Sequence, residues 1–396
     1  MRDNRVPLGR RSLRGMPVGP VVRLDRGHSL LVVGPTQAGK TSSLVVPAIL
    51  AWAGPIVVTS VKSDVVMATE EWRTTRGRVQ RLEPGRDDGL TWDPLEGVTS
   101  LRSALRVAQS LTRESTRTES EFWNSLAVKL LAGLFVAAQQ RHLSIFDVAT
   151  VVESRRWSEW ISHDVSSSHE AMLRSFLDYD PKTLDSVVTT AETMLLPWRF
   201  RQPTARVIDV LDGANTLYLC GARGEHATYE PLFRGALRGV LEEQQRRHDE
   251  GRALPLLLVL DEAATVASLD ELDQLAATLS GLGVTLVTVI QDFAQLVARW
   301  GPRAATIVNN HATRVVLAGL ADPSVATYLP EIVETREDRP VVPLRMRPRN
   351  TAVVVAGRRA VHTVHLRPWW RQRHLRDRGV RRSSVLWRNG GTRRQP

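Results

Sequence analysis

The sequence predicts an α/β domain that is interrupted by a domain made of helices. Short, uninterrupted apolar runs, typical of strands covered on both faces, occur before residue 62 and again after residue 215. From about Leu101 to Trp198, apolar residues instead recur at helical spacing, with no strand signal of similar strength. A glycine-containing loop also joins the first apolar strand directly to a helix. The predicted order is therefore strand and helix, a helical insertion, and then strand and helix again.

The chain has 396 residues, which is enough for two or three domains, each with its own core. A run of turn-forming residues from Arg81 to Pro94 marks one boundary. We expect a basic N-terminal arm at 1–27, an α/β domain in two pieces at 28–98 and 199–370, an inserted all-α domain at 99–198, and a basic, disordered tail at 371–396.

The strands and helices of the predicted α/β domain follow in order along the chain. A strand and helix within 28–53 lead through the turn at Gly54-Pro55 to a second strand, Ile56 to Val61. The later predicted segments are strands at 216–220, 256–260, 284–290 and 314–318, helices at 229–247 and 269–279, and a closing hairpin of 352–356 with 361–366.

The formal net charge of +11 is unevenly distributed. Fifteen arginines and one acid lie in 340–396, and seven arginines and two acids lie in 1–26, so the middle of the chain is acidic. Two basic ends suit a polyanion, either nucleic acid or an anionic membrane surface. Only four lysines accompany 49 arginines, so a chain-wide preference for arginine is the competing explanation.

The single cysteine, Cys220, excludes an internal disulfide and indicates a reducing cytoplasm. The uncharged stretch from Thr41 to Val61 is long enough to suggest a membrane span, but Pro47, Gly54 and Pro55 interrupt it. We therefore expect no transmembrane segment in this chain and a cytoplasmic location, with possible peripheral attachment at the inner face of the cell membrane.

Residues 34 to 41 read GPTQAGKT and match the phosphate-binding pattern G-x-x-x-x-G-K-[S/T], between an apolar strand and an apolar helix. Glycines let backbone N–H groups turn inward, and the helix N-terminus adds a positive dipole. We predict that ATP binds here, with Lys40 on the β and γ phosphates and the Thr41 hydroxyl on Mg²⁺. The predicted nucleotide-binding residues are Gly34, Pro35, Thr36, Gln37, Ala38, Gly39, Lys40, Thr41 and Ser42.

Two adjacent acids follow the most apolar predicted strand, Leu256 to Leu260. A phosphate loop needs a carboxylate that helps to hold the metal and, for hydrolysis, a group that positions water. We predict that Asp261 holds Mg²⁺ through its water shell and that Glu262 polarises the attacking water. Gln291 ends the next predicted strand and is placed to sense the γ-phosphate.

Two other polar stretches allow either a structural or a binding role. Asn309, Asn310 and His311 have side chains that bind phosphates or bases well, but they are also suited to join a helix to the next strand. Trp369 and Trp370 lie between arginines and could stack on bases, or they could pack the closing strand. We favour the structural role in both cases.

Seven ordered segments carry a family resemblance: GPTQAGKT, PIVVTSVKSD, FWNSLAVKLL, LLLVLDEAA, VTLVTVIQD, ATIVNNHATRVVLAGLADP and LRPWW. Together they resemble the coupling proteins of type IV secretion and conjugation, which are hexameric RecA-like ATPases related to the FtsK and HerA DNA motors. The resemblance covers about residues 28 to 370.

The resemblance implies that the α/β part is a RecA-like P-loop NTPase domain. It also implies an ATP-hydrolysing DNA translocase that delivers DNA or a nucleoprotein to a secretion channel. The implied partners are DNA in a central channel and at the arginine-rich ends, a relaxase–DNA complex or protein cargo on the all-α domain, and a separate membrane or secretion-channel protein. The resemblance further implies a homo-hexamer that forms on binding nucleotide or DNA.

Three departures from the family pattern leave alternatives open. Only 33 residues precede Gly34, where family members usually carry membrane helices, and Ser60-Val61-Lys62 lacks the acid of an Asp-x-Lys pattern. No arginine lies between Asp261 and Gln291, so Arg314 and Arg223 are the candidates for acting across a subunit boundary. The alternatives are a cytoplasmic DNA pump in repair or defence, and a nucleotide-dependent adaptor that recruits cargo with little hydrolysis.

Overall fold

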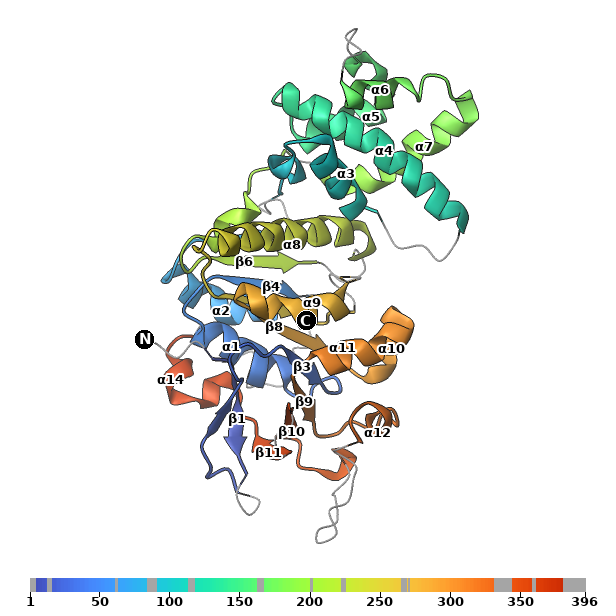
Figure 1. The fold of residues 1–396 in the computed structure, drawn as a ribbon. Coiled ribbons are helices and arrows are strands. Elements are labelled where there is room, and N and C mark those ends of the chain that lie inside the picture. Colours follow the sequence, from blue (N-terminus) through green and yellow to red (C-terminus); the bar gives the residue numbers. More distant parts are fainter. Residues whose placement is uncertain are drawn as a thin grey trace, which may run out of the picture. The chain divides into compact units, whose positions relative to one another are not determined.

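The computed structural model describes residues 5–12, 16–60, 63–83, 91–112, 118–161, 167–199, 202–221, 226–264, 269, 271–330, 344–357 and 361–379 (Figure 1). The chain forms two compact units. The first contains 1–80, 209–220 and 244–396, and the second contains 81–208 and 221–243.

Eleven strands of the described residues form one sheet, in the order β2-β1-β11-β10-β9-β3-β8-β7-β4-β6-β5. Their bounds are β1 Pro7–Arg11, β2 Val21–Arg23, β3 Leu30–Val33, β4 Ile56–Ser60, β5 Val79–Leu82, β6 Thr216–Cys220, β7 Leu256–Leu260, β8 Val284–Ile290, β9 Thr313–Leu317, β10 Thr351–Ala356 and β11 His362–His365. The strands from β9 through β3, β8, β7 and β4 to β6 pair in parallel. β10, β11, β1 and β2 continue from β9 as antiparallel strands.

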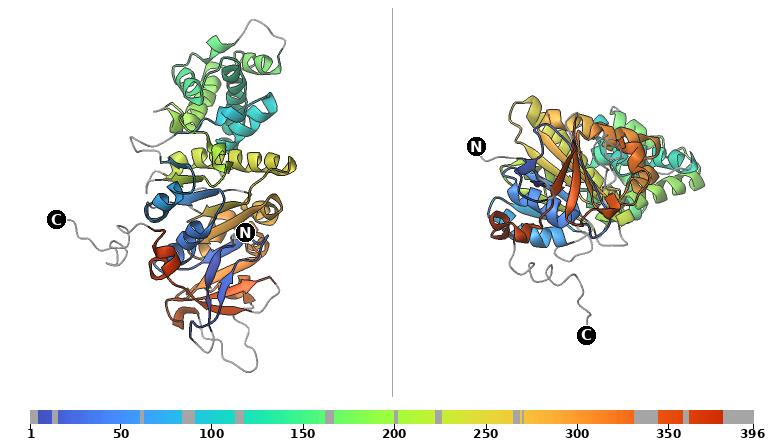
Figure 2. Two further views of the ribbon diagram at one scale, coloured as in Figure 1. Left: turned by 90° about the vertical axis from the view of Figure 1, so that its left-hand side faces the viewer. Right: turned by 90° about the horizontal axis from the view of Figure 1, so that it is seen from below.

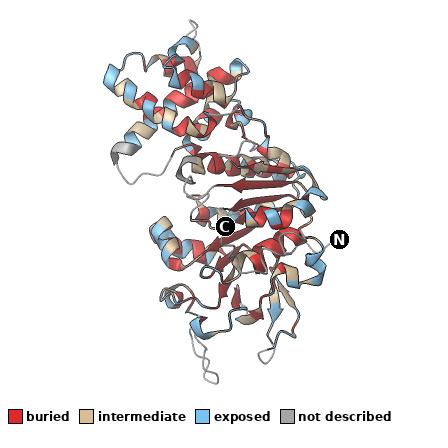
Figure 3. Cartoon of the chain, turned by 180° about the vertical axis from the view of Figure 1, so that it is seen from behind, coloured by how far each residue is buried: buried red, intermediate tan, exposed pale blue. Residues whose placement is uncertain are grey.

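Helices cover both faces of the parallel strands, which accounts for the continuous apolar sequence of those strands (Figures 2 and 3). On one face, α1 (Val46–Ala51), with the π-helical turn Thr41–Val45 before it, and α2 (Asp64–Thr74) pack on alternate residues of the strands. On the other face lie α9 (Leu272–Thr278), α10 (Phe293–Trp300), α11 (Ala304–Asn310) and the last turns of α8 (His226–Asp249), while α12 (Val325–Tyr328) follows β9. The predicted α/β elements from Leu30 onward are therefore confirmed to within a few residues.

The second unit contains α3 (Leu101–Ser110), α4 (Thr118–Gln140), α5 (Ile145–Glu153), α6 (Ser168–Arg174) and α7 (Pro181–Leu195). Within the described residues, α4 from Glu121 to Gln140 is the one helix long and apolar enough to cross a membrane by length and composition. Most of that stretch is buried, and Leu130, Leu134 and Phe135 are completely buried. α4 packs on its neighbours α3, α6 and α7, so its apolar sequence is accounted for by this core.

The helical unit is larger than the predicted insertion, 99–198, because it includes residues 81–98, 199–208 and α8 as far as Glu243. Gly235 of α8 lies against Trp92, where a Cβ atom would approach the indole ring to 2.9 Å. The buried Arg234 donates hydrogen bonds to the carbonyl oxygens of Ser110 and Thr112. Periodicity identifies α8 as a helix, but only these contacts show that α8 belongs to the helical unit as far as Glu243.

Both ends of the chain contain more structure than the sequence predicts. The expected N-terminal arm holds β1 and β2, and the expected disordered tail begins with α14 (Arg373–Arg376). Completely buried Leu375 packs with Trp369 against Val46 and Leu50 of the α1 segment, which places α14 beside α1 (Figure 2). Trp369 therefore has a packing role, but its partners lie in α1, α2 and α14 and not in the closing strand that we expected. Residues 380–396 lie outside the described part of the chain.

Arg73 is a completely buried arginine at the end of α2. Its Nε donates to Thr216 Oγ1 (2.7 Å), and its other nitrogens donate to the backbone carbonyl oxygens of Trp52 (2.9 Å), Gly54 (2.9 Å) and Ala214 (2.7 Å). Burial lowers the pKa of Arg73 to about 10, so the guanidinium stays charged at neutral pH. Arg73 therefore joins α2 to the segments that lead into β4 and β6.

His311 joins α11 to β9 inside the core and is completely buried. A carbonyl oxygen can only accept, so Nδ1 carries the proton that bonds to Ile307 O (2.7 Å), and Nε2 accepts from the Thr288 hydroxyl (2.9 Å). The neighbouring Asn310 Nδ2 donates to Asp273 O (2.8 Å). These contacts confirm the connecting role that we favoured for this stretch. Burial lowers the pKa of His311 to about 4, so the ring is neutral in the folded protein.

We predict that Arg73→Met lowers the free energy of unfolding by about 2–4 kcal/mol, because it leaves buried carbonyl groups without donors. Urea unfolding followed by circular dichroism measures the loss. The control is Arg78→Gln, since the Arg78 side chain is 61% exposed in its ion pair with Asp209 and should change stability by less than about 0.5 kcal/mol. Equal stability of the two variants would contradict the linking role of Arg73.

We also predict that His311 makes the fold less stable in acid. In the unfolded chain this histidine takes up a proton near its ordinary pKa of 6.5, whereas in the folded protein it does so only near 4. The unfolded state therefore binds more protons between these values, and the stabilisation present above 6.5 is lost as the pH falls toward 4. Urea unfolding at several pH values should show the parent losing about 2–3 kcal/mol more over this range than His311→Asn. Parallel pH profiles of the two proteins would refute the prediction.

Candidate nucleotide-binding site

The loop predicted to bind phosphate begins where β3 ends. The Gly34 N–H donates to Ile290 O of the neighbouring strand β8 (3.4 Å). On the other side, a Cβ atom at Gly34 would lie 2.8 Å from the Cβ of Leu317 in β9. Real Cβ atoms do not approach so closely, so this position requires glycine. The start of the loop is therefore held between two strands of the sheet.

The backbone of the loop turns through two residues in the left-handed region, Gln37 (φ 64°) and Gly39 (φ 92°). The Ala38 N–H donates back to Pro35 O (3.2 Å), and the Ser43 N–H donates to Gly39 O (2.9 Å), so the helical segment starts directly after the loop. Successive N–H groups in such a turn form a concave site for anions, which the adjoining helix N-terminus reinforces. The local backbone thus supports the phosphate-binding role predicted for 34–42.

The side chain of Lys40 folds back onto the start of the phosphate loop. Its ammonium donates to the carbonyl oxygens of Gly34 (2.5 Å) and Pro35 (3.1 Å). Thr41 begins the helical segment and is half-buried, whereas Ser42 is buried, with its hydroxyl 3.5 Å from Gly39 O. Thr36 and Gln37 are exposed at the tip. The Lys40 ammonium and the Thr41 hydroxyl therefore come from adjacent residues at the end of the phosphate loop.

The sheet brings the other predicted residues to the same edge as the loop. β8 lies between β3 and β7, and all three strands are parallel, with Val33 level with Ile290 and Leu260 level with Thr288. The carboxyl ends of parallel strands meet at one edge of a sheet, so Gly34, Gln291 and Asp261 all follow strand ends there. Half-buried Gln291 comes directly after Ile290, whose carbonyl oxygen accepts from Gly34.

The backbone after β7 places Asp261 and Glu262 in different surroundings. Asp261 is only 5% exposed, and its N–H donates to Thr59 O of β4 (3.2 Å). Glu262 has a φ of 54°, which for a non-glycine residue costs on the order of 1 kcal/mol. The next N–H, of Ala263, donates to Val289 O of β8 (3.1 Å). A strained turn therefore carries Glu262, as is common for residues at functional sites.

The donor groups at this edge suit Mg²⁺ bound together with a nucleotide. No group of three or more His, Cys, Asp or Glu side chains gathers around a possible metal position among the described residues. Mg²⁺ usually takes one or two carboxylates together with substrate phosphates and water, so such a group is not required. The Thr41 hydroxyl and the Asp261 carboxylate are the oxygen donors that fit this arrangement.

Some loop contacts could not be predicted from the motif. Gly319, after β9, has a φ of 89° and lies close to the Pro35 ring, so β9 supports the loop from beyond Leu317. Arg314 lies in β9 and is level with Leu31 of β3. Leu31 is three residues before the phosphate loop begins at Gly34. The other arginine candidate, Arg223, lies outside the described residues, as does Lys62.

Comparisons with known proteins agree with this geometry. The family model described as "Type IV secretory system Conjugative DNA transfer" matches residues 15–337. The conjugal transfer protein TraG of Escherichia coli is 23% identical over 311 residues, covering 68% of this chain and 49% of TraG. VirD4 of Rhizobium radiobacter is 20% identical over 333 residues, covering 78% of this chain and 48% of VirD4. The chain therefore spans about half the length of these curated relatives.

Solved structures show the same fold at low sequence identity. The bacterial conjugative coupling protein TrwBdeltaN70, in complex with sulphate, superposes with a TM-score of 0.66 at 20% identity, covering 86% of each chain. TrwB in complex with ADP and Mg²⁺ gives 0.65 at 19% identity, covering 87% of this chain and 86% of TrwB. These matches confirm the predicted RecA-like P-loop domain with a helical domain. With the family model spanning most of its length, the chain belongs to the type IV secretory system conjugative DNA transfer family.

Proposed function

We propose that this chain is the ATP-hydrolysing motor of a conjugative coupling protein, which delivers DNA or a nucleoprotein to a type IV secretion channel. The observation that carries the proposal is the meeting of the phosphate loop, the Asp261–Glu262 pair and Gln291 at one edge of the parallel sheet. Relatives of the same fold support it, since TrwB has been solved with ADP and Mg²⁺ and with a non-hydrolysable ATP analogue.

Each residue of the site has a separate role in phosphoryl transfer. Backbone N–H groups of 34–42 hold the phosphates, and Lys40 leaves the Gly34 and Pro35 carbonyl oxygens to contact the β and γ phosphates. Thr41 and Asp261 would hold Mg²⁺, which would supply positive charge for the phosphate oxygens. Glu262 takes a proton from the attacking water, and Gln291 contacts the γ-phosphate.

The link between strands explains how hydrolysis can produce movement. Gln291 follows directly from Ile290, whose carbonyl oxygen accepts from Gly34 at the start of the loop. Loss of the γ-phosphate contact at Gln291 would therefore act on β8 and on α10, which starts at Phe293. In the proposed motor this segment is the first to respond to the nucleotide state, and DNA in a central channel of a homo-hexamer is the load. Cargo recognition belongs to the helical unit.

We predict that Lys40→Ala weakens ATP binding by about 100-fold or more, because the variant loses a charged donor to the phosphates, worth about 3 kcal/mol. Isothermal titration calorimetry with ATP and Mg²⁺ measures the affinity. The matched control is Lys182→Ala, at an exposed position of α7, which should bind ATP like the parent. Parent-like affinity of the Lys40 variant would exclude this loop as the nucleotide site.

We predict that Glu262→Gln binds ATP normally but lowers kcat by about 10²–10⁴, because glutamine cannot accept the proton of the attacking water. Steady-state phosphate release, with and without DNA, measures this effect. Glu242→Gln is the control, since that side chain is 60% exposed on α8. Turnover at the parent rate in the Glu262 variant would disprove its role as the base. A parent that binds ATP but shows no DNA-stimulated hydrolysis would instead indicate the adaptor.

A further inference from the structure

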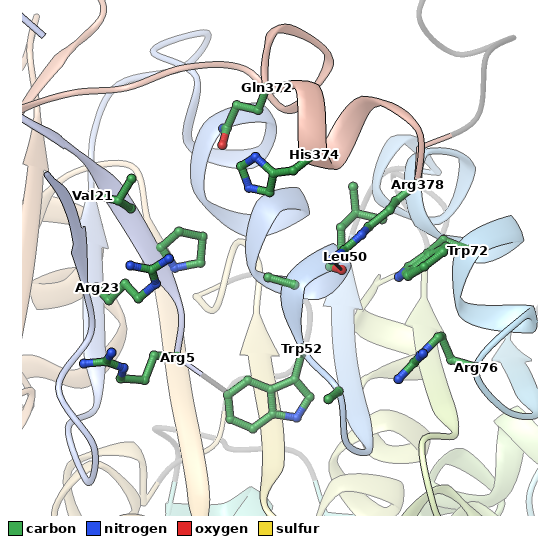
Figure 4. Close-up of a pocket in the computed structure, with 13 residues that line it drawn as sticks. Arg5, Val21, Arg23, Leu50, Trp52, Trp72, Arg76, Gln372, His374 and Arg378 are labelled. Carbon is green, nitrogen blue, oxygen red and sulfur yellow. Dashed lines mark hydrogen bonds between the residues drawn. The ribbon is translucent and has the colours of Figure 1, made fainter. Parts of the chain in front are cut away.

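A pocket of about 300 Å³ lies in the first unit at the sheet edge opposite the phosphate loop (Figure 4). Its floor is the end of α1 and the turn that follows, Leu50 to Ala53, which leads to the start of β4. α1 begins at the carboxyl edge of the sheet and β4 begins at the amino edge, so the pocket belongs to the amino edge. Its volume is at the lower end of the range for ligand pockets.

The pocket is strongly basic. Arg5 and Arg23 line it from the β1–β2 side, and Arg76 and Arg378 line it from the opposite side, with His374 above (Figure 4). None of the 13 lining residues is acidic. Burial is the main cause that lowers the pKa of His374, and the charges of Arg378, Arg23 and Arg10 lower it further. An anion is therefore the complementary ligand.

Trp72 positions two of the arginines. The Arg378 guanidinium lies 5.0 Å from the centre of a Trp72 ring, and that of Arg76 lies 5.9 Å from it. Arg378 also donates to Leu50 O (3.0 Å). Stacked guanidinium groups lose less conformational entropy on binding, and their planar forks match phosphate oxygens. Arg76 and Arg378 are therefore already ordered before a phosphate binds.

The pocket also unites the two basic ends of the chain. Arg5 precedes β1, and Arg378 follows α14, yet both line one pocket. The pairing of β1 with β11 and the packing of α14 on α1 bring these ends together. The two basic regions of the sequence therefore meet at one site in the described part of the chain, and a polyanion is the class of partner that they suit.

We propose that this pocket binds a phosphate group of a nucleic-acid strand. The arginines contact the backbone phosphate, and the apolar floor of Leu50, Ala51 and Trp52 lies below the attached sugar. Trp72 is already stacked with arginines, so bases are not read and binding does not depend on sequence. This site is separate from the nucleotide loop, and its occupation requires neither ATP nor hydrolysis.

The test is fluorescence anisotropy of a labelled short oligothymidylate, without nucleotide, at salt concentrations from about 50 to 200 mM. The pocket variant is Arg23→Gln with Arg76→Gln. The control variant, Arg345→Gln with Arg349→Gln, removes the same charge at exposed positions of the first unit outside the pocket. ATP binding by both variants verifies that the first unit is folded.

We expect the pocket variant to bind the oligonucleotide about tenfold more weakly at about 0.1 M salt, and to lose about 0.7 of the slope of log K against log salt for each phosphate contact removed. The control should change affinity by less than about twofold. Equal affinities and slopes in the two variants would overturn the proposal.

Vesicles containing phosphatidylglycerol form the second arm, because a lipid headgroup also offers a phosphate. The proposal is wrong if the parent binds these vesicles through Arg23 and Arg76 but does not bind the oligonucleotide. Failure of ATP to bind the parent would count against the proposed motor alone, because the oligonucleotide assay contains no ATP.

Discussion

The parallel pairing of β3 with β8, and of β8 with β7, is the constraint on which the nucleotide site depends. It carries three separate segments of chain to one edge of the sheet, and the hydrogen bond from Gly34 to Ile290 continues the pairing into the loop. Leu317 closes the other side of Gly34 so tightly that no side chain fits. The loop therefore has little freedom, and its N–H groups are organised before any phosphate arrives.

The two edges of the parallel sheet differ in chemistry because different residues lie at each edge. At the carboxyl edge, the phosphate loop meets Asp261 and Glu262, a combination suited to a metal-bound triphosphate. At the amino edge, the backbone carbonyl groups of Trp52, Gly54 and Ala214 are met by the buried Arg73. Trp52 lines the basic pocket and also accepts from Arg73, so the pocket adjoins this arginine. The amino edge is therefore basic, whereas the carboxyl edge combines Lys40 with two acids.

Polar side chains in the core act as connectors. Arg73 joins α2 to the entry of two strands, and His311 links α11 to β8 through Thr288. The buried Tyr218 hydroxyl bonds to Thr69 Oγ1 (2.7 Å), which in turn donates to Val65 O of α2, and burial raises the pKa of Tyr218. Each connector makes at least one hydrogen bond to another element, which couples helices to strands beyond what apolar contact alone provides.

Local sequence was sufficient for features that depend on neighbouring residues. The apolar runs of β3, β7 and β8 identified buried strands, and the glycine and lysine spacing identified the phosphate loop between strand and helix. The order of motifs identified the family, which the family model confirmed. These signals are short-range, because a strand covered on both faces and a loop around a phosphate both restrict residues that are close in sequence.

The tertiary structure decided which distant segments meet, since partner choice depends on packing. The segment of α8 up to Glu243 looks like any other helix in sequence, yet Arg234 and Gly235 assign it to the helical unit. The short β1 and β2 gave too weak a pattern to be recognised, and α14 was hidden in an arginine-rich tail. Motif and order thus specified the nucleotide loop, whereas long-range pairing alone brought the two basic ends of the chain to one pocket.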